Sequence, residues 1–331
     1  MFLISISACK GTKKNLINLK KSKKKCRKCL FFEKKHFFCT LFVENWDNHK
    51  IFCNFAGRMV KSILLHNKLM DFSRPRVMAI VNLSDDSFFT SFDMTNEAVF
   101  LQSIEQLIRQ GADILDIGAC STRPNSSPVS AAKEWSLLQR GLSIVRHYWT
   151  EIPISVDTFR AEIAERAVAY GADIINDVSG AKANPMIFDV VAKHHLPYIL
   201  THAQPITLHA MAEVLHFLQQ QLDMLHQREV ADVIIDPGFG FGKTIEQNYT
   251  LLNHLDVLQT LNAPVLVGIS RKSMLYKPLN TIPDNVLAAT VAANTLALQR
   301  GANILRVHDV EAARQAIQIY QLTNPAHNPC L

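Results

Sequence analysis

The stretch Asp232-Val-Ile-Ile-Asp-Pro-Gly-Phe-Gly-Phe-Gly-Lys243 places a strand, a carboxylate and a glycine loop within one short segment. The apolar run at residues 233–235 ends at Asp236 and Pro237, and a continuous apolar run of this kind is typical of a parallel strand covered on both faces. Asp236 is therefore predicted to stand at the carboxyl end of a strand. The glycines that follow allow the backbone to turn sharply and to approach a ligand closely. Taken alone, the stretch also fits an ordinary strand-to-helix turn with a solvated aspartate, because short glycine patterns are common.

The same succession of strand and helix extends outward from this stretch. Eight apolar runs of strand length stand at residues 77–81, 114–117, 152–156, 173–175, 198–200, 233–235, 265–267 and 304–307. Amphipathic stretches with apolar residues at three- and four-residue spacing lie between them, including 97–110, 131–148, 161–170, 211–228 and 285–299. Gly111, Gly171 and Gly301 follow three of these stretches, at the position that glycine prefers after a helix. Alternating units of this number predict an α/β fold, the closed (β/α)8 or TIM barrel, with residues 61–75 as a hairpin that plugs its bottom.

Length, charge and cysteine content agree with a single barrel at residues 59–331. This part is close to the roughly 250 residues of a typical barrel, and no apolar run in the chain is long enough for a membrane-spanning helix. The net charge of +6 comes from residues 1–58, which hold 14 Lys and Arg against 3 Asp and Glu, whereas the remainder holds 21 against 26. A mildly acidic domain gives no indication of nucleic-acid binding. Most cysteines also lie in residues 1–58, so we expect a reducing, cytoplasmic location.

Residues 1–58 form a basic extension that we expect to have little order, because its block of like charges repels itself. We favour the interpretation that it is an upstream extension before a true start at Met59. A transit peptide is the alternative, since acidic residues are scarce there. Its four potential zinc ligands match the spacing of no standard zinc site: Cys26, Cys29, His36 and Cys39.

Each predicted strand ends in polar residues, and the active sites of TIM barrels lie at the carboxyl ends of the strands. The residues at these ends are Asn82, Asp116, Asp157, Asn176 with Asp177, His202, Asp236, Ser270 to Lys272, and Arg306 with His308. Any one of them is explained by a satisfied hydrogen bond at the rim, but a whole ring of them indicates a binding site. Carboxylates and amides suit a flat, nitrogen-rich heterocycle. The cations suit a phosphate or carboxylate: Lys243, Arg271, Lys272, Arg306 and His308.

Several motifs, taken together and in order, resemble the dihydropteroate synthase family across residues 59–323. They are Asn82, Ser121-Thr-Arg-Pro124, Ser155-Val-Asp-Thr158, Ile174-Ile-Asn-Asp177, Asp236-Pro-Gly-Phe-Gly-Phe-Gly-Lys243, Ser270-Arg-Lys-Ser273 and Arg306-Val-His-Asp309. The resemblance implies a transferase of folate biosynthesis that joins 6-hydroxymethyl-7,8-dihydropterin pyrophosphate to 4-aminobenzoate, giving 7,8-dihydropteroate and pyrophosphate. It also implies a homodimer formed through the last helices and a target of sulfonamides.

The resemblance assigns a role to individual positions. It implies that the pterin is bound by Asp157, Asn176, Asp236 and Lys272, the pyrophosphate by Arg306 and His308, and Mg2+ by Asn82. The 4-aminobenzoate site would comprise Thr122, Arg123, Pro124 and Ser273, with Phe88 near the aromatic ring. The residues expected to carry catalysis are Lys272, Asp86 and Arg306. Cleavage of the carbon–oxygen bond precedes attack by the amine in this family, so leaving-group stabilisation and positioning matter more than a strong base.

Three departures from the family pattern lie in or near the loops expected around 4-aminobenzoate. Asp85 replaces a proline and the following glycine pair is missing, Cys120 replaces a glutamate, and His202-Ala-Gln-Pro205 lacks the usual methionine. They leave open a diverged pterin-binding paralogue with another amine acceptor or no turnover. A methyltetrahydrofolate-binding methyltransferase is a weaker alternative, because it would not need the anion-binding sets at 270–273 and 306–309.

Overall fold

The computed structural model describes residues 61–65, 68–84, 91–93, 96–119, 129–207 and 209–323. The predictions for the extension 1–58 and for Asp86, Phe88, Cys120 and Thr122 to Pro124 lie outside the described residues, and they stay predictions.

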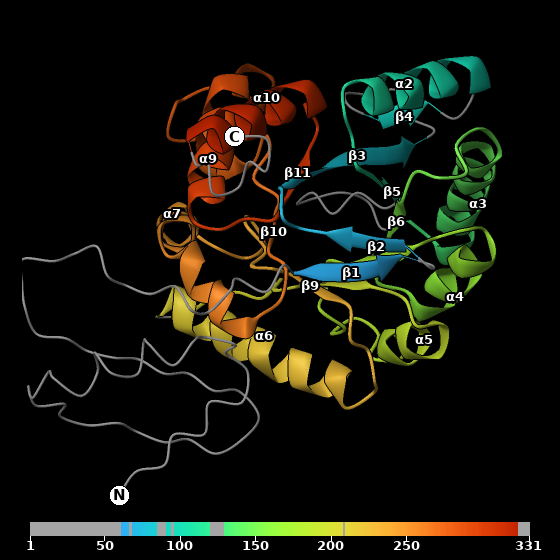
Figure 1. The fold of residues 1–331 in the computed structure, drawn as a ribbon, viewed down its shortest axis with the longest axis horizontal. Helices are drawn as coiled ribbons and strands as arrows, with labels where there is room; N and C mark the ends of the chain where they lie inside the picture. The colour runs from blue at the N-terminus through green and yellow to red at the C-terminus, as the bar shows by residue number, and fades with distance from the viewer. Residues whose placement is uncertain are drawn as a thin grey trace, which may run out of the picture. The chain divides into compact units, whose positions relative to one another are not determined.

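Eight parallel strands form the barrel, which confirms the predicted fold class (Figure 1). The strands are β3 (Arg76–Ser84), β5 (Ile114–Gly118), β6 (Ile154–Asp157), β7 (Ile174–Asp177), β8 (Tyr198–Thr201), β9 (Val233–Asp236), β10 (Leu266–Val267) and β11 (Ile304–Val307). Their order is β10-β11-β3-β5-β6-β7-β8-β9. A parallel bridge between Ile235 and Val265 joins β9 to the start of β10 and so closes the ring. The short strand β4 (Ser91–Asp93) pairs with the carboxyl end of β3.

Helices surround this ring (Figure 1). They are α2 (Glu97–Arg109), α3 (Ala131–Tyr148), α4 (Ala161–Ala169), α5 (Ile187–His194), α6 (Ala210–His226), α7 (Ile245–Asn253), α8 (Ser273–Tyr276), α9 (Leu287–Gln299) and α10 (Val310–Thr323), with 3-10 helices η1 (Leu255–Leu261) and η2 (Pro283–Asn285). Local sequence explains several of their ends. Asn96 accepts hydrogen bonds from the first amides of α2, and Thr244 with Gln247 forms a reciprocal capping box on α7.

The predicted hairpin is confirmed at the amino ends of the strands. β1 (Ser62–Leu65) pairs antiparallel with β2 (Lys68–Asp71), and Figure 1 shows both strands in blue within the ring of helices. Ile63, Leu65 and Phe72 of this segment are buried against one inward-facing residue from each of seven barrel strands: Met78, Ile114, Ile174, Ile199, Ile234, Leu266 and Ile304. The hairpin therefore closes the bottom of the barrel with an apolar layer.

The period of two residues along a strand then determines what lies above this layer. Side chains at alternate positions point to the same face, so the residues two positions beyond the apolar layer also face the barrel interior. They are polar in most strands: Asp116 after Ile114, Asn176 after Ile174, Thr201 after Ile199, Asp236 after Ile234 and Arg306 after Ile304. The barrel thus has an apolar floor and a polar layer at its carboxyl end.

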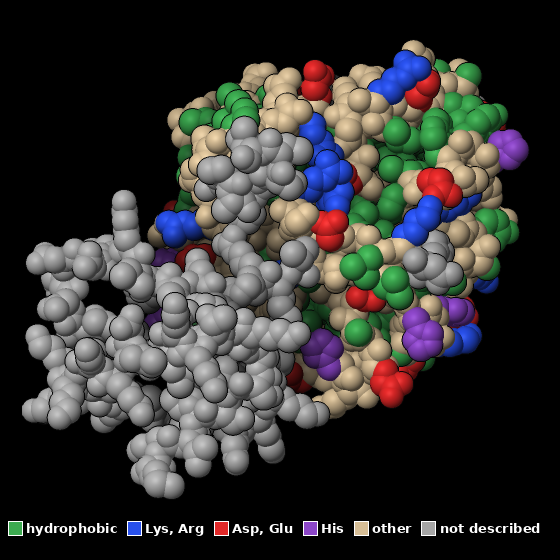
Figure 2. Space-filling view, viewed as in Figure 1, with side chains coloured by type: hydrophobic (Ala, Val, Ile, Leu, Met, Phe, Trp, Pro, Cys, Tyr) green, Lys and Arg blue, Asp and Glu red, His purple; other side chains and the backbone are tan. Residues whose placement is uncertain are grey.

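The face that Figure 2 shows carries charged side chains of both signs. Basic and acidic side chains are interspersed there. Among the described residues, no helix has the length and apolar character needed to cross a membrane.

Candidate active site at the carboxyl ends of the strands

Arg306 is the centre of the polar layer. Its Nε donates to Asp116 Oδ2 at 2.6 Å and its Nη2 donates to Asp157 Oδ2 at 2.7 Å. Asn176 Nδ2 also donates to Asp116 Oδ2, at 3.0 Å. The three strands β5, β6 and β7 and the last strand β11 are thereby joined by one charged network. The resemblance implied a pyrophosphate role for Arg306, and in this structure two of its five N–H groups are used by carboxylates.

Burial dominates the electrostatics of the two predicted pterin-binding carboxylates. It raises the pKa of Asp157 from 3.8 to about 7, against the opposing effect of Arg306 and with a further increase from Asp116. It also raises the pKa of Asp236, against the charges of Lys272 and Arg306 and the hydrogen bond from Gly238 N. Near neutral pH Asp157 can therefore either donate or accept a hydrogen bond, which suits a heterocycle that presents both kinds of group.

Lys272 reaches the same layer from the turn between β10 and α8. Its Nζ donates to the carbonyl of Phe239 at 2.5 Å and lies 4.7 Å from the centre of the Phe241 ring. Burial lowers its pKa to about 8, although Asp236 and Asp157 favour the charged form. The glycine loop and the Ser-Arg-Lys-Ser motif are thus in contact, as a shared site requires.

The predicted anion-binding residues separate into two groups. His308 Nδ1 lies 3.1 Å from Ser270 Oγ, and His308 follows Arg306 by two residues, just before α10. Arg271 instead forms a two-pronged ion pair with Asp309, at 2.7 and 3.1 Å, and contacts Asp284 at 3.1 Å. Arg271 therefore stabilises the turn before α8. Ser273, predicted to contact 4-aminobenzoate, is the first residue of α8.

Asp177 and His202 have structural contacts. Asp177 accepts hydrogen bonds from Tyr198 Oη, Ser179 N and Ala181 N, each at 2.7 Å, so it organises the loop after β7. The His202 ring packs edge-on against Phe217, with the ring centres 5.0 Å apart. Its burial lowers the pKa of His202 to about 4, so this imidazole is neutral near pH 7 and offers no charge to an anion.

Three buried oxygens inside the barrel have no hydrogen-bond partner among the described residues: Asp116 Oδ1, Ser155 Oγ and Thr201 Oγ1. Buried polar atoms are nearly always paired in folded proteins, so these oxygens indicate a polar ligand or water. Thr201 is a functional candidate that the sequence analysis did not name, and Asp116 was named there only as one of the polar strand ends, without a role of its own. The alternation Ile114-x-Asp116 and Ile199-x-Thr201 was the available signal, because it places both side chains inside the barrel.

A magnesium ion is compatible with the position of Asn82, but not as a metal held by the protein alone. Asn82 lies at the carboxyl end of β3, paired in register with Gly118 of β5. Within the part of the chain that the structure describes, no group of three or more His, Cys, Asp or Glu side chains could hold a metal ion. A single neutral amide oxygen fits Mg2+ only if phosphate oxygens and water supply the other ligands, which is how proteins commonly bind it.

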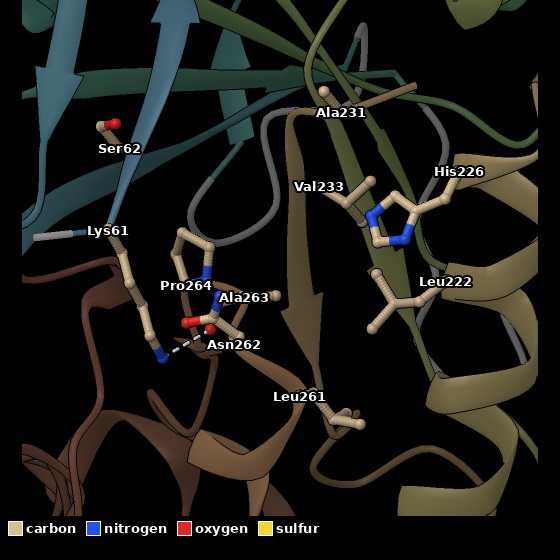
Figure 3. A pocket seen from close by; sticks show the side chains of 10 residues that line it. All are labelled: Lys61, Ser62, Leu222, His226, Ala231, Val233, Leu261, Asn262, Ala263 and Pro264. Atoms are coloured by element: carbon tan, nitrogen blue, oxygen red, sulfur yellow. Dashed lines mark hydrogen bonds between the residues drawn. The ribbon is translucent and has the colours of Figure 1, made fainter. Parts of the chain in front are cut away.

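A separate cavity of about 230 Å3 lies at the opposite end of the barrel (Figure 3). It is lined by Lys61, Ser62, Leu222, His226, Ala231, Val233 and residues 261–264. None of the predicted site residues lines it. We place the chemistry at the carboxyl ends instead, because the fully buried carboxylates Asp157 and Asp236, with raised pKa, and the buried unpaired oxygens Asp116 Oδ1, Ser155 Oγ and Thr201 Oγ1 are found there.

Comparisons with known proteins show which sequences and structures this chain is similar to. The family described as pterin binding enzyme matches residues 78–308. Among curated proteins, the chain is similar to dihydropteroate synthase of Synechocystis sp., with 39% identity over 260 residues that cover 74% of this chain and 89% of that protein. It is also similar to dihydropteroate synthase of Escherichia coli K12, with 35% identity over 267 residues, 77% of this chain and 93% of that protein.

Solved structures give the same result. A Yersinia pestis dihydropteroate synthase in complex with a sulfonamide drug has a TM-score of 0.75 and 33% identity, and the match covers 80% of this chain and 99% of that one. A Xanthomonas albilineans dihydropteroate synthase with 4-aminobenzoic acid has a TM-score of 0.73 and 36% identity, covering 80% and 98%.

Proposed function

We propose that this chain, which belongs to the family of pterin-binding enzymes, is a dihydropteroate synthase. It would transfer the dihydropterinylmethyl group of 6-hydroxymethyl-7,8-dihydropterin pyrophosphate to the amine of 4-aminobenzoate, with release of pyrophosphate. The observation that carries the proposal is the polar layer inside the barrel, in which Asp157 and Asn176 are paired on the adjacent strands β6 and β7 and Asp236 lies on β9, near Lys272.

Hydrogen-bond complementarity supports a pterin in this layer. The pyrimidine half of a pterin has N–H donors beside ring nitrogen and carbonyl acceptors. Asp236 and the ionised form of Asp157 accept hydrogen bonds, whereas Asn176 and Lys272 donate them. Asp116 Oδ1 and Thr201 Oγ1 add two buried oxygens that have no partner among the described residues. A heterocycle that satisfied these atoms would remove an existing cost of burial.

The pyrophosphate would lie toward Arg306, His308 and Ser270. Asn82 would contribute one oxygen to Mg2+, which when bound would offset the negative charge of the pyrophosphate. In the transfer, the bond between the methylene carbon and oxygen breaks and the electron pair leaves with pyrophosphate. The amine nitrogen then bonds to the carbon and loses a proton. The part of the protein is to position both reactants and to stabilise the leaving anion.

The second substrate is proposed from the motif at residues 121–124 and from Ser273. The similar Xanthomonas structure was solved with 4-aminobenzoic acid and the Yersinia structure with a sulfonamide drug. We infer the same ligands for this chain, with Asp86, Phe88, Thr122, Arg123 and Pro124 in the roles that the resemblance assigns. A cytoplasmic location is part of the same proposal.

We also infer a homodimer, and exposed apolar side chains on the last two helices support it. Leu287 and Leu296 of α9 are 45% and 52% exposed, and Ile319 and Leu322 of α10 are 60% and 61% exposed. Hydrophobic side chains are visible over this region in Figure 2. A helix that is apolar on its outer face as well as its inner face is usually covered on both.

The test of the proposal is incorporation of labelled 4-aminobenzoate into dihydropteroate by the purified protein, with dihydropterin pyrophosphate and Mg2+. We expect product and pyrophosphate in equal amounts. Binding of the pterin pyrophosphate with no incorporation would instead establish the diverged paralogue that the loop departures leave open.

A further inference from the structure

Lys243, the last residue of the glycine loop, is a partly buried lysine that links two segments of the site, and its burial lowers the pKa of its ammonium to about 7. Its Nζ donates to the carbonyl of His202 at 2.8 Å, to that of Gly238 at 2.8 Å and to that of Phe241 at 3.1 Å. A lysine ammonium has three N–H donors. All of them are used by backbone carbonyls, so Lys243 does not serve as the substrate anion site that its charge alone suggests.

The glycine loop that Lys243 contacts has a backbone conformation that depends on contacts with the rest of the protein. Gly238, Gly240 and Gly242 have φ of +69°, +84° and +60°, which residues other than glycine rarely adopt. The loop also lies against the segment after β8, because a Cβ on Gly238 would stand 1.9 Å from the carbonyl oxygen of His202. A backbone carbonyl that points into such a loop needs a hydrogen-bond donor. Lys243 supplies one to the segment after β8, at His202, and to the loop after β9, at Gly238 and Phe241.

The same loop contacts two residues proposed to bind the pterin. Its Phe239 carbonyl accepts from Lys272 Nζ, and its Phe241 ring lies beneath that ammonium. Its Gly238 N donates to Asp236 Oδ1 at 2.7 Å. Gly240 lies close to the Lys272 side chain, since a Cβ there would stand 3.1 Å from Lys272 Cδ. Any movement of the loop would therefore displace both Asp236 and Lys272.

We propose that Lys243 is a positioning residue, whose ammonium fixes the glycine loop so that Asp236 and Lys272 keep the geometry needed to bind the pterin. The inference rests on the proposed function for its effect on substrate. Its structural step, the placement of Lys272 by the loop, does not depend on which reaction the site carries out.

The experiment compares Lys243→Met with Lys61→Met. Lys61 also donates to a carbonyl, that of Ala263 at 2.8 Å, and to Gln259 Oε1 at 2.7 Å, but it does so at the opposite end of the barrel. The two variants thus lose the same chemical group at the two ends. Lys243→Arg keeps a charge but cannot direct three donors from one atom, and it gives a milder change if Lys243→Met does not fold.

Two quantities are measured for each variant. The first is the reactivity of Lys272 toward acetic anhydride across the titration range of lysine, followed by mass spectrometry. The second is the dissociation constant of dihydropterin pyrophosphate with Mg2+. We expect Lys243→Met to make Lys272 more reactive at a pH where its amine is neutral, because a loosened loop exposes the amine to the reagent. We expect the same variant to weaken pterin pyrophosphate binding by about 10- to 100-fold, as for lost hydrogen bonds to charged groups. Lys243→Arg should lie between this variant and the unaltered protein.

The inference is overturned if Lys272 reacts alike in Lys243→Met and Lys61→Met, or, when only the milder variant folds, alike in Lys243→Arg and Lys61→Met. If the unaltered protein binds no pterin pyrophosphate, the proposed function fails. The Lys272 labelling then still decides whether Lys243 positions the loop.

Discussion

Replacing Arg306 by methionine should destabilise the protein by an amount that depends on pH. Arg306 has only 14% of its side chain exposed, and it is paired with Asp116 and Asp157, at 0% and 7%. Removing one member of a buried ion pair typically costs about 3–5 kcal/mol, because the remaining charge is left without compensation. We therefore expect the free energy of unfolding to fall by about that amount near pH 8.

The pH dependence follows from the pKa of Asp157. Burial raises this pKa from 3.8 to about 7 in the folded protein, so the folded state binds the proton more tightly than the unfolded state. This group's contribution to stability is therefore present below about pH 3.8 and is lost as the pH rises toward 7. Without Arg306, which lowers the pKa, the folded-state value should be higher still. In Arg306→Met, unlike the unaltered protein, the free energy of unfolding then continues to fall above pH 7, by up to about 1.4 kcal/mol per pH unit.

The assay is urea unfolding of the two proteins at a pH below 7 and at a pH above it, with Asp157→Asn/Arg306→Met as the control. The double variant should recover part of the stability and most of the pH-dependent difference, because one of the two carboxylates that Arg306 compensates, the one with the raised pKa, is gone. An equal loss of stability at both pH values would refute the reasoning, and so would a loss below about 1 kcal/mol, the range of an exposed ion pair.

Three further predictions concern single side chains of the site. Lys272→Ala should reduce turnover by orders of magnitude in the dihydropteroate assay; a near-normal rate would remove Lys272 from the site. Thr201→Val should weaken binding of the pterin pyrophosphate by about 2- to 10-fold, the effect of one hydrogen bond, without loss of thermal stability, and unchanged affinity would show that the Thr201 hydroxyl does not meet the ligand. Gly238→Ala should lower the free energy of unfolding by at least about 2 kcal/mol, since its φ of +69° and the His202 carbonyl both oppose a Cβ. In Gly268→Ala the nearest atom would be 3.9 Å away, so denaturant titration should find it much closer to the unaltered protein, and equal losses would contradict the account of the loop.

The barrel could be predicted from sequence because its signals are local. Apolar runs, helix-ending glycines and their alternation depend on neighbouring residues, and all eight predicted strands are present. Helix bounds were less accurate where tertiary contacts decide them. The stretch expected to be helical from residue 285 begins as a 3-10 turn at Pro283–Asn285, and α9 starts only at Leu287.

The sequence could predict which polar residues gather at the carboxyl ends of the strands, but not how their side chains pair. Arg306 and Asp116 are separated by 190 positions in the chain, and no local pattern indicates that their side chains meet. Neighbouring residues were also hard to tell apart. Asn176 faces the barrel interior, whereas Asp177 turns to the backbone of its own loop. The role of Lys243 depends on three carbonyl directions, which composition cannot reveal.

The most direct test of the central claim is a crystal structure of the protein with dihydropterin pyrophosphate. The account predicts the pterin ring inside the carboxyl end of the barrel, within hydrogen-bond distance of Asp157, Asn176 and Asp236, with Asp116 Oδ1 or Thr201 Oγ1 newly paired. Electron density for the ligand only in the opposite cavity beside Lys61 and His226, with the polar layer unchanged, would contradict it.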